Sequence, residues 1–413
     1  MPRLLLLLPT RTYRAHDFME AASRLGVDVT VGSERKQALA DLTPGRTLAL
    51  DFLNLQAATQ AIVAFAEAFP LDAIIGVDDD TAILGAMAAQ ALDLPHNNVT
   101  AVRATRNKHR LRMLLAQAGL LSPPFSLFST QIDPFKAARQ VPFPCVVKPL
   151  CLSASRGVMR ADTPEQFVTA FNRLGALLRT PEVMERGGEL ARQILVEGFI
   201  PGVEVALEGL LVKGELTVLA LFDKPDPLDG PFFEETLYIT PSRLDEATQQ
   251  AVAACTAQAA RAIGLEEGPV HAELRVNAYG AWMIEIAARS IGGLCSRTLR
   301  FGTGVALEEL ILLHAMGADI ATYRRENKAA GVMMIPIPYG GILRGVYGEA
   351  EARQVEGIEE LDIMIPIGQE VIPLPEGAQY LGFLFARADT PEQVETALRQ
   401  AHDHLTFVVE PPA

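Results

Sequence analysis

A predicted β-hairpin around residue 280 constrains this chain more than any other segment. Polar and apolar side chains alternate along His271–Val276 and again along Trp282–Ala287, so both runs are predicted to be strands. The intervening loop, residues 278–280, ends in glycine, which suits the left-handed conformation that a three-residue hairpin loop requires. This register sets Glu273 opposite Glu285 on one face of the hairpin.

Two carboxylates that face each other across a hairpin need an explanation. Like charges directly opposite each other destabilise a sheet. A divalent cation removes that penalty, and carboxylates commonly share Mg²⁺ with the phosphates of a substrate. The alternative is an exposed hairpin whose glutamates face water. Glu273 and Glu285 are therefore a candidate metal site that the hairpin alone does not establish.

Length and charge limit the classes of protein to consider. A chain of 413 residues predicts two or three domains. A net charge of −14 argues against nucleic acid or an anionic membrane as partner, so any polyphosphate must be held by a few placed cations. The four cysteines lack metal-type spacing and suggest reduced thiols. The leucine run that ends at Pro9 is shorter than a signal-peptide core, and no stretch is long enough to span a bilayer. We expect a cytoplasmic protein.

Strand and helix patterns alternate through the first part of the chain. The predicted strands are Leu4–Leu8, Val27–Val31, Thr47–Leu50 and Ala73–Val77, and the predicted helices are Ala15–Leu25, Gln56–Phe69 and Thr81–Leu92. This alternation predicts a parallel, Rossmann-like sheet with helices on both faces. Residues 9–11 and 78–80 would border a crevice at its strand ends, where ligands bind in such sheets. The three aspartates at 78–80 have an alternative role as a helix N-cap cluster. A GxGxxG loop is absent after the first strand, which disfavours a dinucleotide and hydride transfer.

Phosphate contacts are expected near residue 150. Lys148 ends an apolar strand, where it can meet an anion. The segment after it is rich in small, hydroxyl and cationic side chains that can form a mobile phosphate-binding loop. Its candidate contacts are Ser153, Ser155, Arg156 and Gly157. An ordinary surface turn is the alternative, and the spacing is not that of a P-loop.

Two further segments gain meaning from their order. Residues 195–208 join two strands through a Pro-Gly turn, where Glu197 and nearby backbone groups can meet an adenine and Glu204 can accept ribose hydroxyls. Solvated glutamates beside a common turn are the alternative. Lys108 lies on a basic predicted helix, Arg103–Ala118, and precedes Lys148 by forty residues.

In sequence, these motifs resemble the ATP-grasp superfamily of carboxylate–amine ligases. His271–Arg275, Ile284–Arg289 and Gly292-Gly293 are most similar to the L-amino-acid ligases, which form dipeptides, and Asp223–Pro225 and Pro231–Tyr238 also resemble that group. The resemblance implies an α/β and α+β multidomain protein: an N-terminal α/β domain (1–98), an ATP-grasp domain of two α+β subdomains (99–325, lid about 120–198) and a small α+β closing domain (326–413).

The resemblance also implies roles for individual residues around the nucleotide. Lys108 and Lys148 would hold the ATP phosphates, and the loop would close over them. The adenine would meet Glu197 and Phe199, and the ribose would meet Glu204. Lys224 is a weaker phosphate candidate, for which a surface position beside two prolines is the alternative. The loop departs from the superfamily pattern, since it has Leu152 and Ala154 where glycines are frequent.

Around the substrates, Glu273 and Glu285 would bind Mg²⁺, with Mn²⁺ as an alternative. Arg289 would bind the substrate carboxylate and steady an acyl phosphate, aided by the backbone at Gly292 and Gly293. The remaining candidates are Glu234 or Glu235, one of which would meet a substrate ammonium, and His271, which would either assist amine deprotonation or serve as a hydrogen-bonded sheet histidine beside the metal. Ala287 stands where many members have asparagine, a loss that the amino-acid ligases share.

The implied activity is ATP-dependent joining of a carboxylate, expected to be an L-amino acid, to an amine through an acyl phosphate. The partners would be small molecules, and homodimers are common in the superfamily. Two alternatives share the ATP site: a carboxylase of the bicarbonate-activating or purine-pathway type, and a non-catalytic ATP-binding regulator. The second is disfavoured because the lysines, the paired glutamates and Arg289 are all present.

Overall fold

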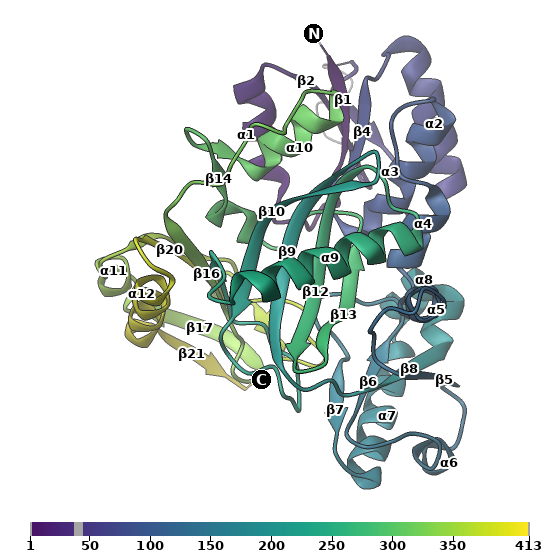
Figure 1. Ribbon diagram of the computed structural model, residues 1–413, viewed down its shortest axis with the longest axis vertical. Coiled ribbons are helices and arrows are strands. Elements are labelled where there is room, and N and C mark those ends of the chain that lie inside the picture. The colour runs from purple at the N-terminus through teal and green to yellow at the C-terminus, as the bar shows by residue number, and fades with distance from the viewer. Residues whose placement is uncertain (1, 37–43, 412–413) are drawn as a thin grey trace.

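The computed structural model describes residues 2–36 and 44–411 and begins with a four-stranded parallel sheet of order β3-β2-β1-β4 (Figure 1). The predicted parallel sheet is thus confirmed. The leucine run forms β1, and Leu4–Leu7 are fully buried. The strands are β1 (Arg3–Leu7), β2 (Asp28–Ser33), β3 (Thr47–Ala49) and β4 (Ala73–Gly76), and the helices are α1 (Ala15–Leu25), α2 (Leu55–Ala68) and α3 (Asp79–Ala91).

The helix expected over Arg103–Ala118 is two helices, α4 (Val99–Thr105) and α5 (Lys108–Gln117). Asn107 separates them because its side chain accepts a hydrogen bond from the backbone N–H of Arg110 and so begins a new helix. This break places Lys108 in the first turn of α5.

A separate four-stranded antiparallel sheet follows, of order β5-β8-β6-β7, and lies at the lower right of Figure 1. We call residues 120–198, which contain it, the lid. Its strands are β5 (Phe125–Ser129), β6 (Cys145–Pro149), β7 (Met159–Ala161) and β8 (Gln193–Gly198), and its helices are α6 (Pro134–Ala138), α7 (Pro164–Leu178), α8 (Pro181–Gly187) and the 3-10 helix Gly188–Arg192.

The centre of the molecule is an eight-stranded antiparallel sheet of order β13-β12-β9-β10-β11-β16-β20-β18. Its first five strands are β9 (Val203–Val212), β10 (Glu215–Lys224), β11 (Leu237–Thr240), β12 (Gly268–Asn277) and β13 (Gly280–Ala287), and α9 (Glu246–Ile263) packs beside β13. A short 3-10 helix (Cys295–Thr298), β14 (Arg300–Phe301), β15 (Val305–Ala306) and α10 (Leu307–Ala315) lead out of it. Helix α10 packs against α1 of the N-terminal part.

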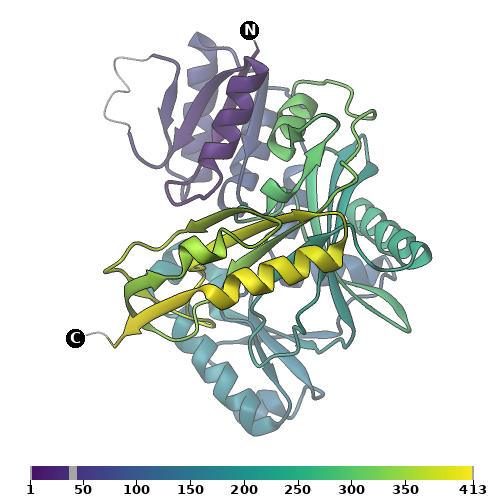
Figure 2. The ribbon, with the colours of Figure 1, turned by 90° about the vertical axis from the view of Figure 1, so that its left-hand side faces the viewer.

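The C-terminal strands divide between two sheets. β16 (Ala329–Ile335), β18 (Ile358–Ile363) and β20 (Gly382–Ala388) extend the central sheet, while β17 (Gly341–Tyr347), β19 (Glu370–Val371) and β21 (Thr406–Glu410) form a small sheet. Helix α12 (Pro391–His404) lies over β16 and β20, with the short α11 (Glu349–Ala352) beside it (Figure 2). The expected closing part therefore shares its sheet with the core, because β11 pairs with β16. The domain boundaries remain predictions.

The hairpin has the predicted pairing but a different turn. Asn277 pairs with Gly280, so the loop has two residues and not three. Gly280 has a φ of +124°, a region that favours glycine and allows this tighter reversal. A bulge at Ile284 adds one unpaired residue to β13 and so offsets the residue missing from the loop. Glu273 therefore pairs with Glu285 as predicted.

Candidate active site

A cavity of about 1330 Å³ lies where the N-terminal sheet, the lid and the central sheet meet. Residues 9–11 and 78–80 line it, so the crevice predicted at the strand ends is present. Of the predicted site residues, all of which the structure describes, Gly157, Glu234 and the weaker candidate Lys224 lie outside the lining. The others that line it are Lys108, Lys148, Ser153, Ser155, Arg156, Glu197, Phe199, Glu204, Glu235, His271, Glu273, Glu285, Arg289, Gly292 and Gly293.

The lysine side of the cavity is built on a buried ion-pair network. Lys148 Nζ lies 2.7 Å from Glu197 Oε2, and Arg112 Nε lies 2.7 Å from Glu197 Oε1. Burial lowers the pKa of Lys148, Glu197 opposes this, and Arg112 and Lys108 add to it. The Glu197 side chain thus holds cations, and its expected contact with adenine stays a prediction. Two guanidinium groups lie over the ring of Phe199, that of Arg160 at 4.1 Å and that of Arg275 at 4.9 Å from the ring centroid.

Lys108 connects the loop after β6 to the hairpin. Its ammonium donates to the carbonyl of Leu152 at 2.9 Å and lies 3.5 Å from Glu285. The loop itself contains Ala154 and Ser155 at φ values of +54° and +53°. Left-handed conformations are unfavourable for residues with a Cβ, so the contacts around the loop must hold it in place.

Those contacts come from the C-terminal part as well as from the N-terminal part. The Gly157 N–H donates to Pro375 O at 2.8 Å, and Arg156 Nε donates to Glu376 O at 2.8 Å. Helix α7 adds a bidentate pair between Arg173 and Glu376. The lid is therefore docked against the C-terminal part of the chain.

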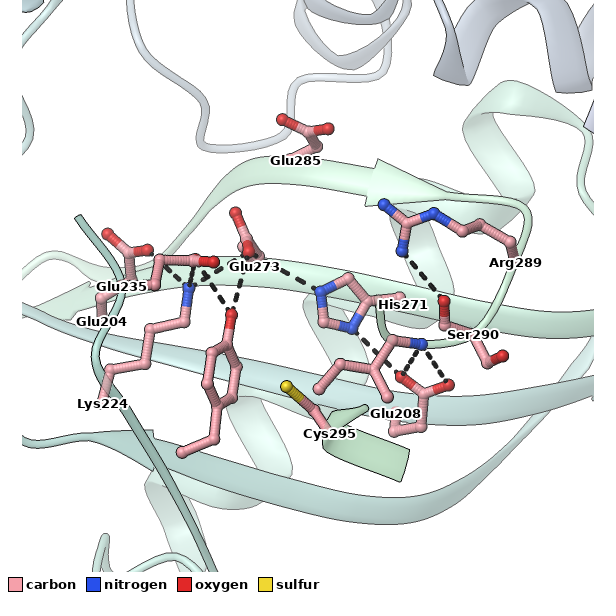
Figure 3. A network of polar contacts seen from close by, with 12 residues as sticks. Glu204, Glu208, Lys224, Glu235, His271, Glu273, Glu285, Arg289, Ser290 and Cys295 are labelled. Atoms are coloured by element: carbon pink, nitrogen blue, oxygen red, sulfur yellow. Dashed lines mark hydrogen bonds and ion pairs between the residues drawn. The ribbon is translucent and has the colours of Figure 1, made fainter. Parts of the chain in front are cut away.

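The hairpin carboxylates are held by different lysines. Glu273 lies 3.1 Å from Lys224 Nζ, whereas Glu285 lies near Lys108. Lys224 is buried and also contacts Glu204 and Glu235, so it is not the surface lysine that its neighbouring prolines allowed. Burial alone would lower the pKa of Lys224, but the three carboxylates raise it well above its ordinary value. Figure 3 shows the ammonium among them.

Of the two neighbouring glutamates, Glu235 faces the cavity. Its carboxylate accepts from Tyr238 Oη at 2.9 Å. Burial and the nearby Glu273 raise the pKa of Glu235 to about 7, against the opposing effect of Lys224. The carboxylates of Glu204, Glu235 and Glu273 each place an oxygen within 4.8 Å of the others.

His271 connects the hairpin to the loop that follows it. Its Nδ1 lies 3.1 Å from Glu208, and its Nε2 lies 3.6 Å from Glu273 (Figure 3). The fully buried Glu208 also accepts from the backbone N–H of Ile291 at 3.0 Å. This network orients both the imidazole and the loop that carries Arg289, Gly292 and Gly293.

Arg289 is held by the N-terminal part of the chain. Its Nε lies 3.0 Å from Asp79 Oδ1 and its Nη2 donates to Asp79 Oδ2 at 3.1 Å, which makes a bidentate pair. The next residue, Ser290, accepts from Arg14 at 2.7 Å. Asp78 occupies the N-cap of α3 and Asp79 its first turn, so the aspartate run serves both the helix and the cavity.

Sequence reasoning missed Arg112 and Glu208, and it did not single out Asp79. Arg112 follows Lys108 by four residues on α5, and Glu208 follows Glu204 by four on β9, so each shares a face with a predicted site residue. Those spacings were available in the sequence. The partner of Asp79 was not, because Arg289 lies 210 residues away.

Three family models match this chain. They are an ATP-grasp N-terminal domain over residues 19–96, an ATP-grasp domain over 141–298 and an L-amino acid ligase C-terminal domain 2 over 333–410. Alanine–anticapsin ligase of Bacillus subtilis is 27% identical over 266 residues, which cover 61% of this chain and 56% of that protein. The chain therefore spans little more than half the length of this curated relative.

Two solved structures are similar over nearly the whole chain. The crystal structure of an L-amino acid ligase from Bacillus licheniformis has a TM-score of 0.84 and 27% identity, with 99% of both chains covered. Phosphoribosylglycinamide synthetase from Anaerococcus prevotii has a TM-score of 0.69 and 16% identity, covers 99% of this chain and 100% of its own, and shares the fold alone.

The fold, together with the matching family models and the similar solved structure, identifies this chain as an ATP-grasp protein. Within that superfamily the chain belongs to the L-amino-acid ligase group. Across residues 2–36 and 44–411, no helix combines the length and apolar character needed to cross a membrane.

Proposed function

We propose that this protein is an ATP-dependent ligase that joins a carboxylate, most simply that of an L-amino acid, to an amine through an acyl phosphate. One observation carries the proposal: a single cavity is lined by Lys108 and Lys148, the docked loop after β6, the paired glutamates and Arg289. Cations from three elements can face a polyphosphate there, while Arg289 can bind a carboxylate.

The chemistry requires activation of the carboxylate, because oxide is a poor leaving group. A carboxylate oxygen attacks the γ-phosphorus of ATP, ADP leaves, and an acyl phosphate forms. The amine nitrogen then attacks the acyl carbon, phosphate leaves and the nitrogen loses a proton. Lys108, Lys148 and Arg289 would stabilise charge on the phosphoryl and carboxylate oxygens. The docked loop would exclude water, which otherwise hydrolyses the intermediate.

The residues present fit Mg²⁺, because the candidate ligands are carboxylate oxygens on two adjacent strands. Glu273 and Glu285 would hold the ion, which when bound neutralises charge on phosphoryl oxygens. Glu235, with its raised pKa, and the neighbouring Tyr238 offer polar groups to a substrate ammonium.

Phosphate release from ATP with Mg²⁺, measured across the standard L-amino acids singly and in pairs, tests the proposal. Mass spectrometry of the products should show a new amide only for certain pairs. Phosphate release that depends on bicarbonate, with no amide, would contradict the proposal and support a carboxylase. ATP binding without turnover on any carboxylate would support a regulator.

A further inference from the structure

The carboxylate of Asp79 is a junction between three parts of the molecule. It pairs with Arg289 in the loop after β13, accepts from Ser153 Oγ at 2.9 Å in the lid loop, and lies 3.2 Å from Arg106 Nη1 after α4. Arg106 also donates to Ser153 at 3.4 Å. Asp79 is 12% exposed and Arg289 14%, so water competes little for these contacts. Burial alone would raise the pKa of Asp79, but Arg106, Arg289 and Ser153 hold it well below its ordinary value.

The hydrogen bonds of Arg289 leave two of its N–H bonds for a ligand. Asp79 takes the side formed by Nε and Nη2, and the carbonyl of Ser290 accepts from Nη1 at 2.9 Å. A guanidinium has five N–H bonds, so two remain, one on each terminal nitrogen. Both N–H bonds can donate to the oxygens of a carboxylate.

We infer that Asp79 is a positioning residue that couples the carboxylate-binding arginine to the position of the phosphate loop. Its side chain fixes Arg289 with two N–H bonds available to the substrate, and the same carboxylate draws Ser153 into the closed position. Asp79 therefore holds the loop closed through Ser153 only when the same carboxylate is also paired with Arg289. This inference rests on the proposed function, since it assigns Arg289 to the carboxylate substrate and Ser153 to the lid loop.

Asp79→Asn tests the coupling, because it keeps the size of the side chain and removes its charge. We expect the KM for the carboxylate substrate to rise about tenfold or more, the loss typical of a charged hydrogen-bonded pair, while the KM for the amine is unchanged. The amide formed per phosphate released should fall, because water reaches the acyl phosphate. Equal changes in both KM values, with the amide yield per phosphate intact, would overturn the inference.

A second readout needs no turnover. Arg156 offers trypsin a cleavage site within the loop, and the product beginning at Gly157 is identified by mass. In the presence of ATP and Mg²⁺, Asp79→Asn should be cut there several-fold faster than the wild type. Wild-type protein that forms no amide would refute the proposed function, whereas a productive enzyme with unchanged KM and unchanged cutting in Asp79→Asn would refute this inference alone.

Two further variants separate coupling from general damage. Asp28→Asn removes the same charge on β2, outside the cavity lining, where the carboxylate pairs with Arg3, and it should leave both readouts at wild-type values. Ser153→Ala removes the hydrogen bonds of the loop serine to Asp79 and Arg106 and leaves the pair between Asp79 and Arg289 in place. It should lower the amide yield per phosphate and speed cutting after Arg156, with the carboxylate KM unchanged. Wild-type behaviour of Ser153→Ala would contradict the proposed coupling even if Asp79→Asn did not fold.

Discussion

Lys148 and Glu197 lie on the same face of two adjacent lid strands, diagonal to each other, and their charged atoms are 2.7 Å apart. Arg112, from helix α5 outside the lid sheet, contacts the same carboxylate. Glu197 therefore compensates two buried cations at once. This arrangement fixes the lysine that we propose to bind phosphate, through a residue that need not touch the nucleotide itself.

Replacing Glu197 should cost more stability than replacing Lys148. Glu197→Gln leaves the charges of Lys148 and Arg112 without a counter-ion, which should lower the free energy of unfolding by about 3–5 kcal/mol. Lys148→Met leaves Glu197 paired with Arg112, so its loss should be smaller and its main effect should be weaker ATP binding. Urea unfolding and nucleotide titration measure the two effects. Equal losses of unfolding free energy in the two variants would refute the prediction that Glu197 matters more for stability than Lys148.

The contribution of Glu197 should also depend on pH. Arg112 and Lys148, against the opposing effect of burial, hold its pKa below the ordinary value of 4.5. A carboxyl with a lowered folded-state pKa stabilises the fold above its ordinary pKa and loses that contribution as pH falls below it. The difference in unfolding free energy between wild type and Glu197→Gln should therefore shrink as the pH drops below 4.5. A difference that stays constant or grows on acidification would contradict the lowered pKa.

Lys224→Met should expose the carboxylate cluster to divalent cations. Without the ammonium, Glu204, Glu235 and Glu273 repel one another, and loss of a buried charge partner should cost about 3 kcal/mol or more. Added Mg²⁺ should then raise the melting temperature of the variant more than that of the wild type. Lys213→Met, in the exposed turn between β9 and β10, is the matched control and should respond like the wild type. An equal response of Lys224→Met and wild type would argue against the cluster as a cation site.

The pair between Arg173 and Glu376 should matter little for overall stability. Both side chains are more than 40% exposed, and exposed pairs contribute about 1 kcal/mol or less. Arg173→Met should therefore change the free energy of unfolding by no more than this amount in urea titrations. Faster proteolysis within the lid without a change in global stability would show that the pair acts on docking. A loss of unfolding free energy as large as that expected for Glu197→Gln would contradict the small contribution expected from an exposed pair.

Local sequence pattern predicted the parts of the site that lie within single elements. The alternation along the hairpin strands placed Glu273 opposite Glu285 although the turn was misjudged, because the shorter loop and the bulge at Ile284 compensate. The alternating elements at the start predicted the parallel sheet and its crevice for a similar reason, since each strand and helix buries its own periodic face.

Local patterns could not predict contacts between elements that are far apart in the sequence. The sequence left Lys224 open between a phosphate contact and a surface position beside two prolines, and its burial follows only from the position of β10 within the central sheet. The pair between Asp79 and Arg289 depends on how the N-terminal sheet docks, which no local period encodes. Resemblance supplied roles for several residues in the motifs, but none for Asp79, which lies outside them, or for Glu208 at the end of the segment 195–208.

The transfer of oxygen from carboxylate to phosphate tests the central claim most directly. The enzyme would receive ATP, Mg²⁺, an amine and a carboxylate substrate labelled with ¹⁸O. An acyl phosphate mechanism predicts that each amide formed releases inorganic phosphate carrying one ¹⁸O atom, because the oxygen that attacked phosphorus leaves with it. Amide formation with unlabelled phosphate, or with the label in AMP, would contradict the account.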